Sequence, residues 1–143
     1  MIAYLLDTNV LSELRKGRRC DPSVALWQAG LTANDQFVSV ISLMEIQSGI
    51  LAARRSDERF ADLLADWYEN RVKPTFDGRV LGIDLEIAER CSLLMNQRTR
   101  GLSDALIAAT AHVLGFTLVT RNVDDFRDTG IRLVNPWQTG PAS

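Results

Sequence analysis

Short apolar runs alternate with longer stretches of helical periodicity along the whole chain. Each run is four or five residues long, and at least one predicted helix separates it from the next, except that a turn region follows the run at 116–119. This alternation is typical of a parallel sheet, because parallel neighbours need a helical crossover between them. We therefore predict an α/β fold with a short central parallel sheet of four to five strands flanked by helices. The predicted strands are 2–6, 37–41, 80–83, 116–119 and 131–134.

Length and composition fit one folded domain. The chain has 143 residues, of which 46% are hydrophobic and 24% charged, so it can bury a core of its own. We find no internal repeat, linker or low-complexity segment and predict a single domain over residues 1–143. No apolar run reaches the roughly 18 residues of a membrane span, and no secretion signal opens the sequence. We expect a cytoplasmic protein without membrane contact.

Net charge and cysteine usage exclude several classes. Sixteen basic and eighteen acidic residues leave a net charge of −2, which rules out polyanion binding by bulk charge. Any phosphate contact must come from a local patch, and the densest basic patch lies at residues 15–19. Cys20 and Cys91 lack the spacing of a metal or redox motif, so we expect free thiols in a reducing compartment.

Acidic and amide residues gather near the ends of the predicted strands. In parallel α/β sheets, ligands bind outside the carboxyl ends of the strands. Side chains that follow different strands therefore meet at one edge, which predicts a site there. The candidates are Asp7 after the first strand, Glu45 after the second, Asp104 at the helix before the fourth, and Asn122 and Asp125 directly after the fourth.

Each acid also has an ordinary structural explanation. Asp7 fits the cap of a following helix, residues 42–45 match a capping box, and residues 103–104 match a cap followed by a first-turn acid. Asp125 fits a solvated loop acid. For each residue alone, these alternatives stay open. The apolar neighbours of the acids, and their common place at strand-to-helix junctions, favour a shared site.

A cluster of three carboxylates would need a counter-charge. At about 5 Å separation and an effective dielectric of about 20, each pair costs about 3 kcal/mol, which is on the order of 10 kcal/mol for the trio. That cost is comparable to the whole stability of a domain. Oxygen ligands without nearby histidine or cysteine favour Mg²⁺ or Mn²⁺ over zinc. Such an ion suits phosphoryl chemistry, because it polarises a phosphate oxygen and lowers the pKa of a bound water.

Four segments of the chain resemble, in order, the signature segments of PIN-domain ribonucleases. The chain is similar in particular to the VapC toxins of bacterial toxin–antitoxin pairs, and its closing Asn-Pro-Trp at 135–137 resembles the FitB branch of that group. The resemblance runs from Asp7 to Trp137. The four segments are LLDTNV at 5–10, the helix start at 42–45, DALIAATA at 104–111 and TRNVDDF at 120–126.

The resemblance implies a Mg²⁺- or Mn²⁺-dependent endoribonuclease that hydrolyses RNA phosphodiesters, in tRNA or another structured RNA, with a metal-activated water. It assigns Asp7, Glu45 and Asp104 as metal-binding and catalytic acids. Asn122 stands where relatives similar to FitB have an aspartate, and an amide oxygen can bind a metal without contributing charge. Asp125, three residues later, is the alternative fourth acid.

The resemblance also implies partners. A cognate VapB-like antitoxin is expected to insert basic residues into the acidic site, since guanidinium groups pair well with carboxylates. We expect a homodimer, an RNA substrate, and contact with DNA only through the antitoxin. Arg15 and Arg121 are the expected contacts to RNA phosphates. The supporting residues, expected to hold the acids or bridge to metal-bound waters, are Thr8, Asn9, Ser103 and Thr120.

Three other classes compete with this interpretation. A phosphotransferase of the haloacid-dehalogenase type needs an acid where Asn9 stands, and a receiver domain needs a late lysine, whereas the last lysine here is Lys73. Both are disfavoured. A non-catalytic PIN module that binds RNA or a partner protein remains the alternative, because Asn122 weakens the charge of the site.

Overall fold

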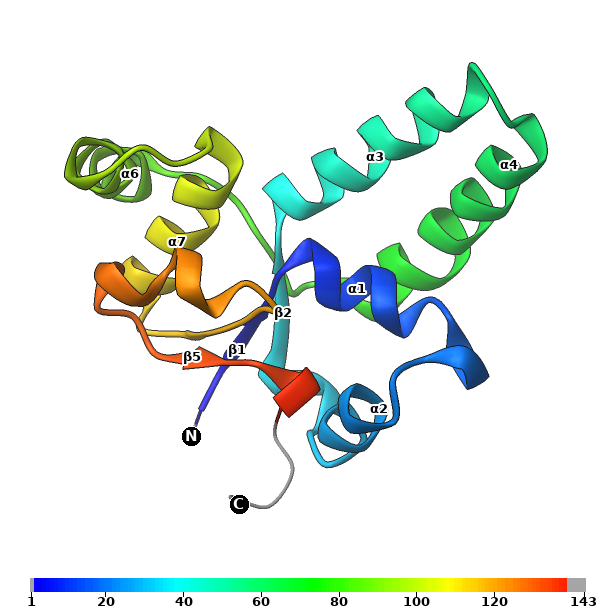
Figure 1. Ribbon diagram of the computed structural model, residues 1–143, viewed down its shortest axis with the longest axis horizontal. Helices are drawn as coiled ribbons and strands as arrows, with labels where there is room; N and C mark the ends of the chain where they lie inside the picture. Colours follow the sequence, from blue (N-terminus) through cyan, green and yellow to red (C-terminus); the bar gives the residue numbers. More distant parts are fainter. Residues whose placement is uncertain (1, 139–143) are drawn as a thin grey trace.

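A computed structural model describes residues 2–138, so the single domain predicted over residues 1–143 extends at both ends beyond the described part. Five strands form one parallel sheet in the order β3-β2-β1-β4-β5, which confirms the predicted α/β class (Figure 1). The strands are β1 (Tyr4–Leu6), β2 (Gln36–Ser39), β3 (Val80–Leu81), β4 (Thr117–Val119) and β5 (Leu133–Val134).

Helices connect the strands. None of those described between residues 2 and 138 is both long and apolar enough to span a bilayer. Short helical turns complete the connections: η1 (Gly17–Arg19), η2 (Ala33–Asp35), the π-helical η3 (Tyr68–Val72), η4 (Val123–Asp125), η5 (Arg127–Thr129) and η6 (Pro136–Gln138). The α-helices are α1 (Thr8–Leu14), α2 (Pro22–Ala29), α3 (Val40–Arg54), α4 (Glu58–Trp67), α5 (Lys73–Thr75), α6 (Leu85–Gln97) and α7 (Leu102–Leu114).

The sheet separates two hydrophobic cores. Successive strand residues point to opposite faces, so Leu5 packs into the core that holds α6 and α7, while Leu6 packs into the core that holds α1 and α3. In Figure 1, α6 and α7 lie on one side of the strands, and α3 and α4 form a helical pair that projects away on the other. Residues that follow β1 therefore lie between two helical layers.

Two helices begin earlier than the sequence predicts. β2 ends at Ser39, and the Ser39 hydroxyl accepts the N–H of Ile41 at 3.0 Å and so caps α3. The prediction of a strand through residue 41 is therefore wrong, and so is the capping box at 42–45. Val40 and Ile41, predicted as the end of the strand, instead start α3. α7 likewise begins at Leu102 with Gly101 as its N-cap, so Ser103 lies inside the helix.

The helical segment that follows α3 continues through Pro74. α4 passes into the π-turns of η3 and then into α5, which contains Pro74 in its first turn. Proline is tolerated there, because the first turn of a helix needs no N–H donor at that position. The continued chain brings Phe76 into the core that holds α1 and α3.

Candidate functional site

A pocket of about 470 Å³ opens where β1 and β4 end. The N–H of Asp7, just after β1, donates to the carbonyl oxygen of Val119, the last residue of β4, at 2.9 Å. The chain order of the strands reverses here, with β2 and β3 on one side of β1 and β4 and β5 on the other. Ligands of α/β sheets bind at such switch points. The residues that line the pocket include Asp7, Glu45, Asp104, Asn122, Arg15 and Arg121.

Asp7 is fixed by hydrogen bonds on both carboxylate oxygens. It is only 5% exposed. Its Oδ1 accepts the N–H of Thr8 at 2.8 Å, and its Oδ2 accepts the hydroxyl of Thr120 at 2.9 Å and the side-chain amide of Asn9 at 3.4 Å. Asp7 is thus the N-cap of α1 and a pocket acid at once, so capping and a role in the site do not exclude each other.

Thr120 joins the end of β4 to the start of α1. Besides donating to Asp7, its buried hydroxyl accepts the side-chain amide of Asn9 at 3.3 Å and the N–H of Asn122 at 3.1 Å. One donor and two acceptor sites are all that a hydroxyl offers, so this group is fully used. The N–H of Arg121 donates to Asn9 Oδ1 at 3.3 Å and adds a further link.

Glu45 and Asp104 reach the pocket from helices on opposite faces of the sheet. Glu45 lies in α3, and its Oε1 accepts the hydroxyl of Thr8 at 2.6 Å. Asp104 lies in the first turn of α7 and is half-buried. Ser103, the neighbouring residue, does not line the pocket. Three acids separated by 38 and 59 positions of sequence therefore share one pocket.

Burial raises the pKa of Asp7 from 3.8 to about 6. The hydrogen bonds from Thr120 and Thr8 lower this pKa, and the negative charges of Asp104 and Glu45 raise it further. Desolvation disfavours the charged carboxylate, and nearby like charges act in the same direction. The pocket thus holds an acid whose charge is poorly compensated by its surroundings.

The pKa of Asp104 is also raised, first by burial and then by the negative charges of Glu45 and Asp125, while Arg100 lowers it. These carboxylates influence one another without meeting at a single point. Across residues 2–138, no three aspartate, glutamate, histidine or cysteine side chains are grouped closely enough to enclose a metal ion. The donors converge on a pocket, not on a preformed cage.

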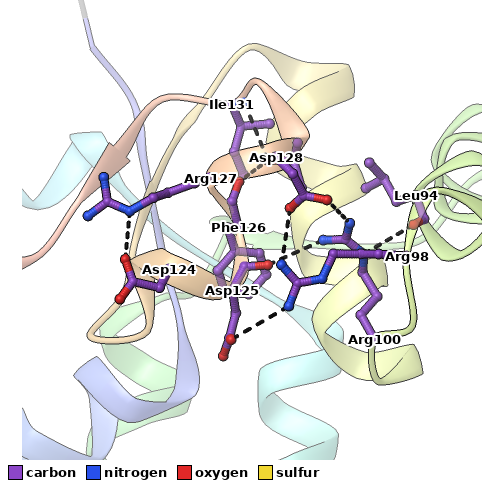
Figure 2. Close-up of polar contacts among 10 residues, drawn as sticks. Leu94, Arg98, Arg100, Asp124, Asp125, Phe126, Arg127, Asp128 and Ile131 are labelled. Atoms are coloured by element: carbon purple, nitrogen blue, oxygen red, sulfur yellow. Dashed lines mark hydrogen bonds and ion pairs between the residues drawn. The ribbon is translucent and has the colours of Figure 1, made fainter.

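Asn122 and Asp125 lie on different sides of Asp104. Asn122 lines the main pocket together with Asp7. Asp125 lines a second pocket of about 210 Å³, which also contains Asp104, and its Oδ1 lies 3.9 Å from the guanidinium of Arg98 (Figure 2). The amide and the carboxylate therefore approach Asp104 from separate cavities.

The rim of the main pocket is basic. The guanidinium of Arg121 lies 5.0 Å from the ring centre of Trp137, and that of Arg15 lies 5.6 Å from the ring centre of Phe60. Such contacts favour a cation held over an aromatic face. Lys16 also lines the pocket, although it was not predicted as a site residue. Its place in the basic patch at residues 15–19 was the only indication in the sequence.

Glu13 is a buried acid of the pocket that the sequence analysis missed. Its carboxylate accepts from Lys16 Nζ at 2.9 Å and from the N–H of Asp21 at 2.8 Å, and the hydrogen bond from Lys16 lowers its pKa. Glu13 thus holds the turn between α1 and α2 while its charge is compensated. The (i, i+3) spacing of Glu13 and Lys16 was the available signal.

An acid-lined pocket at the switch point of a short parallel sheet is the arrangement of a PIN domain. The PIN-domain profile matches residues 4–131, and the chain belongs to this family. It is 33% identical over 139 residues to the VapC ribonuclease Y4jK of Sinorhizobium fredii, covering 94% of this chain and 97% of that relative. It is 30% identical over 138 residues to the toxin FitB of Neisseria gonorrhoeae, covering 93% and 97%.

Solved structures give the same relationship. FitAB bound to an IR36 DNA fragment superposes with a TM-score of 0.84 at 26% identity, over 98% of this chain and 99% of that one. A toxin–antitoxin complex from Klebsiella pneumoniae superposes with a TM-score of 0.68 at 29% identity, over 94% and 98%. In both cases the similarity covers nearly the whole chain.

Proposed function

We propose that this protein is a metal-dependent endoribonuclease and the toxin of a VapBC-type toxin–antitoxin pair. The observation that carries the proposal is the convergence of Asp7, Glu45 and Asp104 on one pocket at the switch point of a PIN domain. The relatives named VapC ribonuclease and toxin FitB support the same activity. RNA as substrate also makes the cytoplasm the expected location.

The pocket residues fit a hard divalent cation, Mg²⁺ or Mn²⁺, in the chemistry of their donors. The acids and the amide of this pocket are oxygen donors. The pKa of Asp7 is raised first by burial and then by the negative charges of Asp104 and Glu45, and a cation would offset this cost. Asp7, Glu45 and Asp104 would hold the ion, with the amide oxygen of Asn122 or the carboxylate of Asp125 as a further ligand. When bound, the ion supplies a water of lowered pKa and neutralises charge on the scissile phosphate.

The other residues of the pocket orient these ligands and the substrate. Thr120 and Asn9 fix the carboxylate of Asp7, and Thr8 fixes that of Glu45, so neither acid has to reorganise when its ligand binds. Arg121, Arg15 and Lys16 line the same pocket and offer positive charge to the RNA backbone.

Cleavage of RNA by the purified, antitoxin-free protein tests the proposal. Total RNA or tRNA is incubated with Mg²⁺ or Mn²⁺, with and without chelator, and the ends of the products are mapped. We expect chelator-sensitive cleavage that leaves 5′-phosphate and 3′-hydroxyl ends. Equal cleavage by an Asp7→Asn variant would identify a contaminating nuclease and overturn the assignment.

The proposed partner is a VapB-like antitoxin, with DNA contacted only through it, and the proposed toxin is a homodimer. The structural neighbours include a toxin–antitoxin complex and a FitAB complex bound to DNA, which supports an antitoxin as partner. An antitoxin arginine would pair with the pocket acids and block the metal site. Co-expression with the adjacent small gene should yield a stable complex that no longer cleaves RNA, whereas cleavage by that complex at the rate of the free protein would contradict the proposal.

A non-catalytic PIN module that binds RNA or protein is the second candidate function. Asn122 favours it, because the pocket has an uncharged amide where FitB-like relatives are expected to supply an acid. This candidate predicts RNA binding without cleavage at any Mg²⁺ or Mn²⁺ concentration. Cleavage that requires Asp7 would exclude it.

A further inference from the structure

Arg100 is a buried arginine next to the pocket that takes no part in the proposed chemistry. Its side chain is 4% exposed, so it cannot reach a large substrate such as RNA. Its guanidinium instead donates three hydrogen bonds (Figure 2): to the carbonyl oxygen of Leu94 at 3.1 Å, to that of Asp125 at 3.3 Å, and to the carboxylate of Asp128 at 2.5 Å. These acceptors belong to α6, η4 and η5, so one rigid fork joins three segments.

The first of the linked parts is the start of α7. Arg100 directly precedes Gly101, the N-cap of α7, and no side chain caps this helix. The N–H of Ala105 donates to the carbonyl oxygen of Gly101 at 3.0 Å, so the turn that carries Asp104 begins from the backbone next to Arg100. Fixing Arg100 therefore fixes where the turn with Asp104 starts.

The second linked part is the loop after β4. The N–H of Asp125 donates to the carbonyl oxygen of Asn122 at 3.0 Å, and the carbonyl oxygen of Asp125 accepts from Arg100. Phe126, 1% exposed, anchors the same loop in the core that holds α7. Arg100 is thus the polar link between this loop and the polypeptide that leads into α7.

We propose that Arg100 is a positioning residue of the site: it holds the loop that carries Asn122 and Asp125 at a fixed distance from Asp104. The inference rests on the proposed function, because that function is what makes Asp104, Asn122 and Asp125 candidate metal ligands. A buried guanidinium with three partners suits this role, since removal of one partner of a buried charged network strongly disturbs the rest.

Arg98 offers a matched comparison. Its side chain is 43% exposed and lies 3.9 Å from Asp125 and 3.7 Å from Asp128, so it faces the same acids from solvent. Exposed ion pairs of this length contribute little. If charge near the acids were all that mattered, Arg98 and Arg100 would be equivalent. If the buried guanidinium positions the ligands, only the loss of Arg100 should weaken metal binding.

The test compares Arg100→Met with Arg98→Met in the full-length chain. Amide hydrogen exchange is measured at Ala105 and Asp125 in the metal-free protein, and the affinity for Mn²⁺ alone is measured by electron paramagnetic resonance. We expect Arg100→Met to speed exchange at both amides by about tenfold and to weaken Mn²⁺ binding by about 10–100-fold. Arg98→Met should stay within about twofold of the wild type in both measurements.

The outcomes separate positioning from simple stabilisation. A folded Arg100→Met protein with unchanged Mn²⁺ affinity, or with faster exchange at only one of the two amides, would overturn the proposal. If Arg100→Met does not fold, Asp128→Asn replaces it, since this change keeps the guanidinium and weakens its anchor. Asp128→Asn should then lower Mn²⁺ affinity several-fold, and no change would overturn the proposal equally.

Arg100→Lys tests the geometry directly. An ammonium keeps the charge but cannot bond three segments in the fixed directions of a guanidinium, so it should recover only part of the lost affinity. Full recovery would contradict the positioning role. These measurements need no RNA, so a failure of the positioning inference is distinct from a failure of the ribonuclease proposal, which the cleavage assay decides.

Discussion

The two acids on either side of the pocket are held in opposite ways. Asp7 follows a strand and is nearly inaccessible, and both of its carboxylate oxygens accept hydrogen bonds. Asp104 lies in the first turn of a helix, is half-buried, and has no hydrogen bond to its carboxylate within the part of the chain that the structure describes. Asp7 is preorganised by direct contacts, whereas Asp104 depends on where its helix begins.

This contrast separates two ways of building one site. At the Asp7 end, the positions of the ligand oxygens come from a short hydrogen-bond network, which only partly offsets the cost of burying the charge. At the Asp104 end, position comes from backbone packing and from the buried fork of Arg100. Substitutions at the first end should therefore act on charge and chemistry. Substitutions at the second end should act on geometry.

The largest expected effect is the loss of activity in Asp7→Asn. The change keeps the shape of the side chain and removes its charge, so the cation that would neutralise charge on the phosphate loses a fixed ligand. We expect the rate of RNA cleavage to fall by about 10²–10³-fold at saturating Mg²⁺. Asp77→Asn, an exposed aspartate remote from the pocket, is the matched control and should retain the wild-type rate. An Asp7→Asn rate within about threefold of the wild type would remove Asp7 from the site.

The second prediction concerns pH and stability in chelator. Asp7 has a pKa of about 6 in the folded protein and 3.8 as its ordinary value. The folded state binds this proton more tightly than the unfolded state, so its contribution to stability decreases as pH rises from about 3.8 to 6 and stays low above that. Two pH units correspond to about 3 kcal/mol. The free energy of unfolding of Asp7→Asn, relative to the wild type, should therefore rise by about that amount between pH 4 and 7.5.

Urea denaturation at a series of pH values measures this difference. Comparison with Asp7→Asn cancels the titration of the other groups, which both proteins share. A difference that does not change with pH would mean that Asp7 is not held in an unfavourable charged state. Saturating Mg²⁺ should reduce the difference, because a bound cation offsets the charge of Asp7.

The third prediction concerns Thr120→Val. The substitution removes the hydroxyl that donates to Asp7 and accepts from Asn9 and Asn122. Activity should fall by about 10–100-fold, as for other groups that orient metal ligands, and stability by about 1–3 kcal/mol. Thr110→Val removes a buried hydroxyl that bonds only within α7, to Leu106, and should lower stability without a specific loss of activity. Equal losses of activity in the two variants would show that Thr120 has no special role.

Much of the fold was accessible from the sequence because apolar periodicity carries it. All five predicted strands are present, and they pair in parallel as predicted. Short apolar runs separated mainly by helices leave few other arrangements. The boundaries were less accessible. Val40 and Ile41 have strand propensity, yet the hydroxyl of Ser39 caps a helix that begins at Val40, so the local preference of two residues does not decide the boundary.

The site was predictable in part for the same reason. Strand ends identify Asp7, and four ordered segments point to Glu45 and Asp104, which the fold brings to one pocket. Contacts between side chains distant in sequence were not predictable. Nothing in the local pattern around Arg100 indicates that two of its three acceptors lie 25 and 28 residues away.

The smallest expected effects on Mn²⁺ affinity come from substitutions of Asn122 and Asp125. They test which cavity beside Asp104 holds the metal ion. Asn122→Asp adds a negative charge to the main pocket, where Asp7 and Glu45 also lie. An added charge in this partly solvated place is worth about 1 kcal/mol toward a cation, which is about a fivefold gain in affinity. Asp125→Asn removes an exposed carboxylate whose partner Arg98 is 3.9 Å away, so Mn²⁺ affinity should change by less than about threefold.

Titration of each variant with Mn²⁺ alone measures both effects in the same experiment. The comparison is informative because the two residues are three positions apart on one loop, yet line different cavities beside Asp104. Higher Mn²⁺ affinity in Asn122→Asp, with little change in Asp125→Asn, would identify the main pocket as the metal site. The reverse order, with a large loss in Asp125→Asn and no gain in Asn122→Asp, would move the ion to the smaller cavity and make Asp125 the fourth ligand.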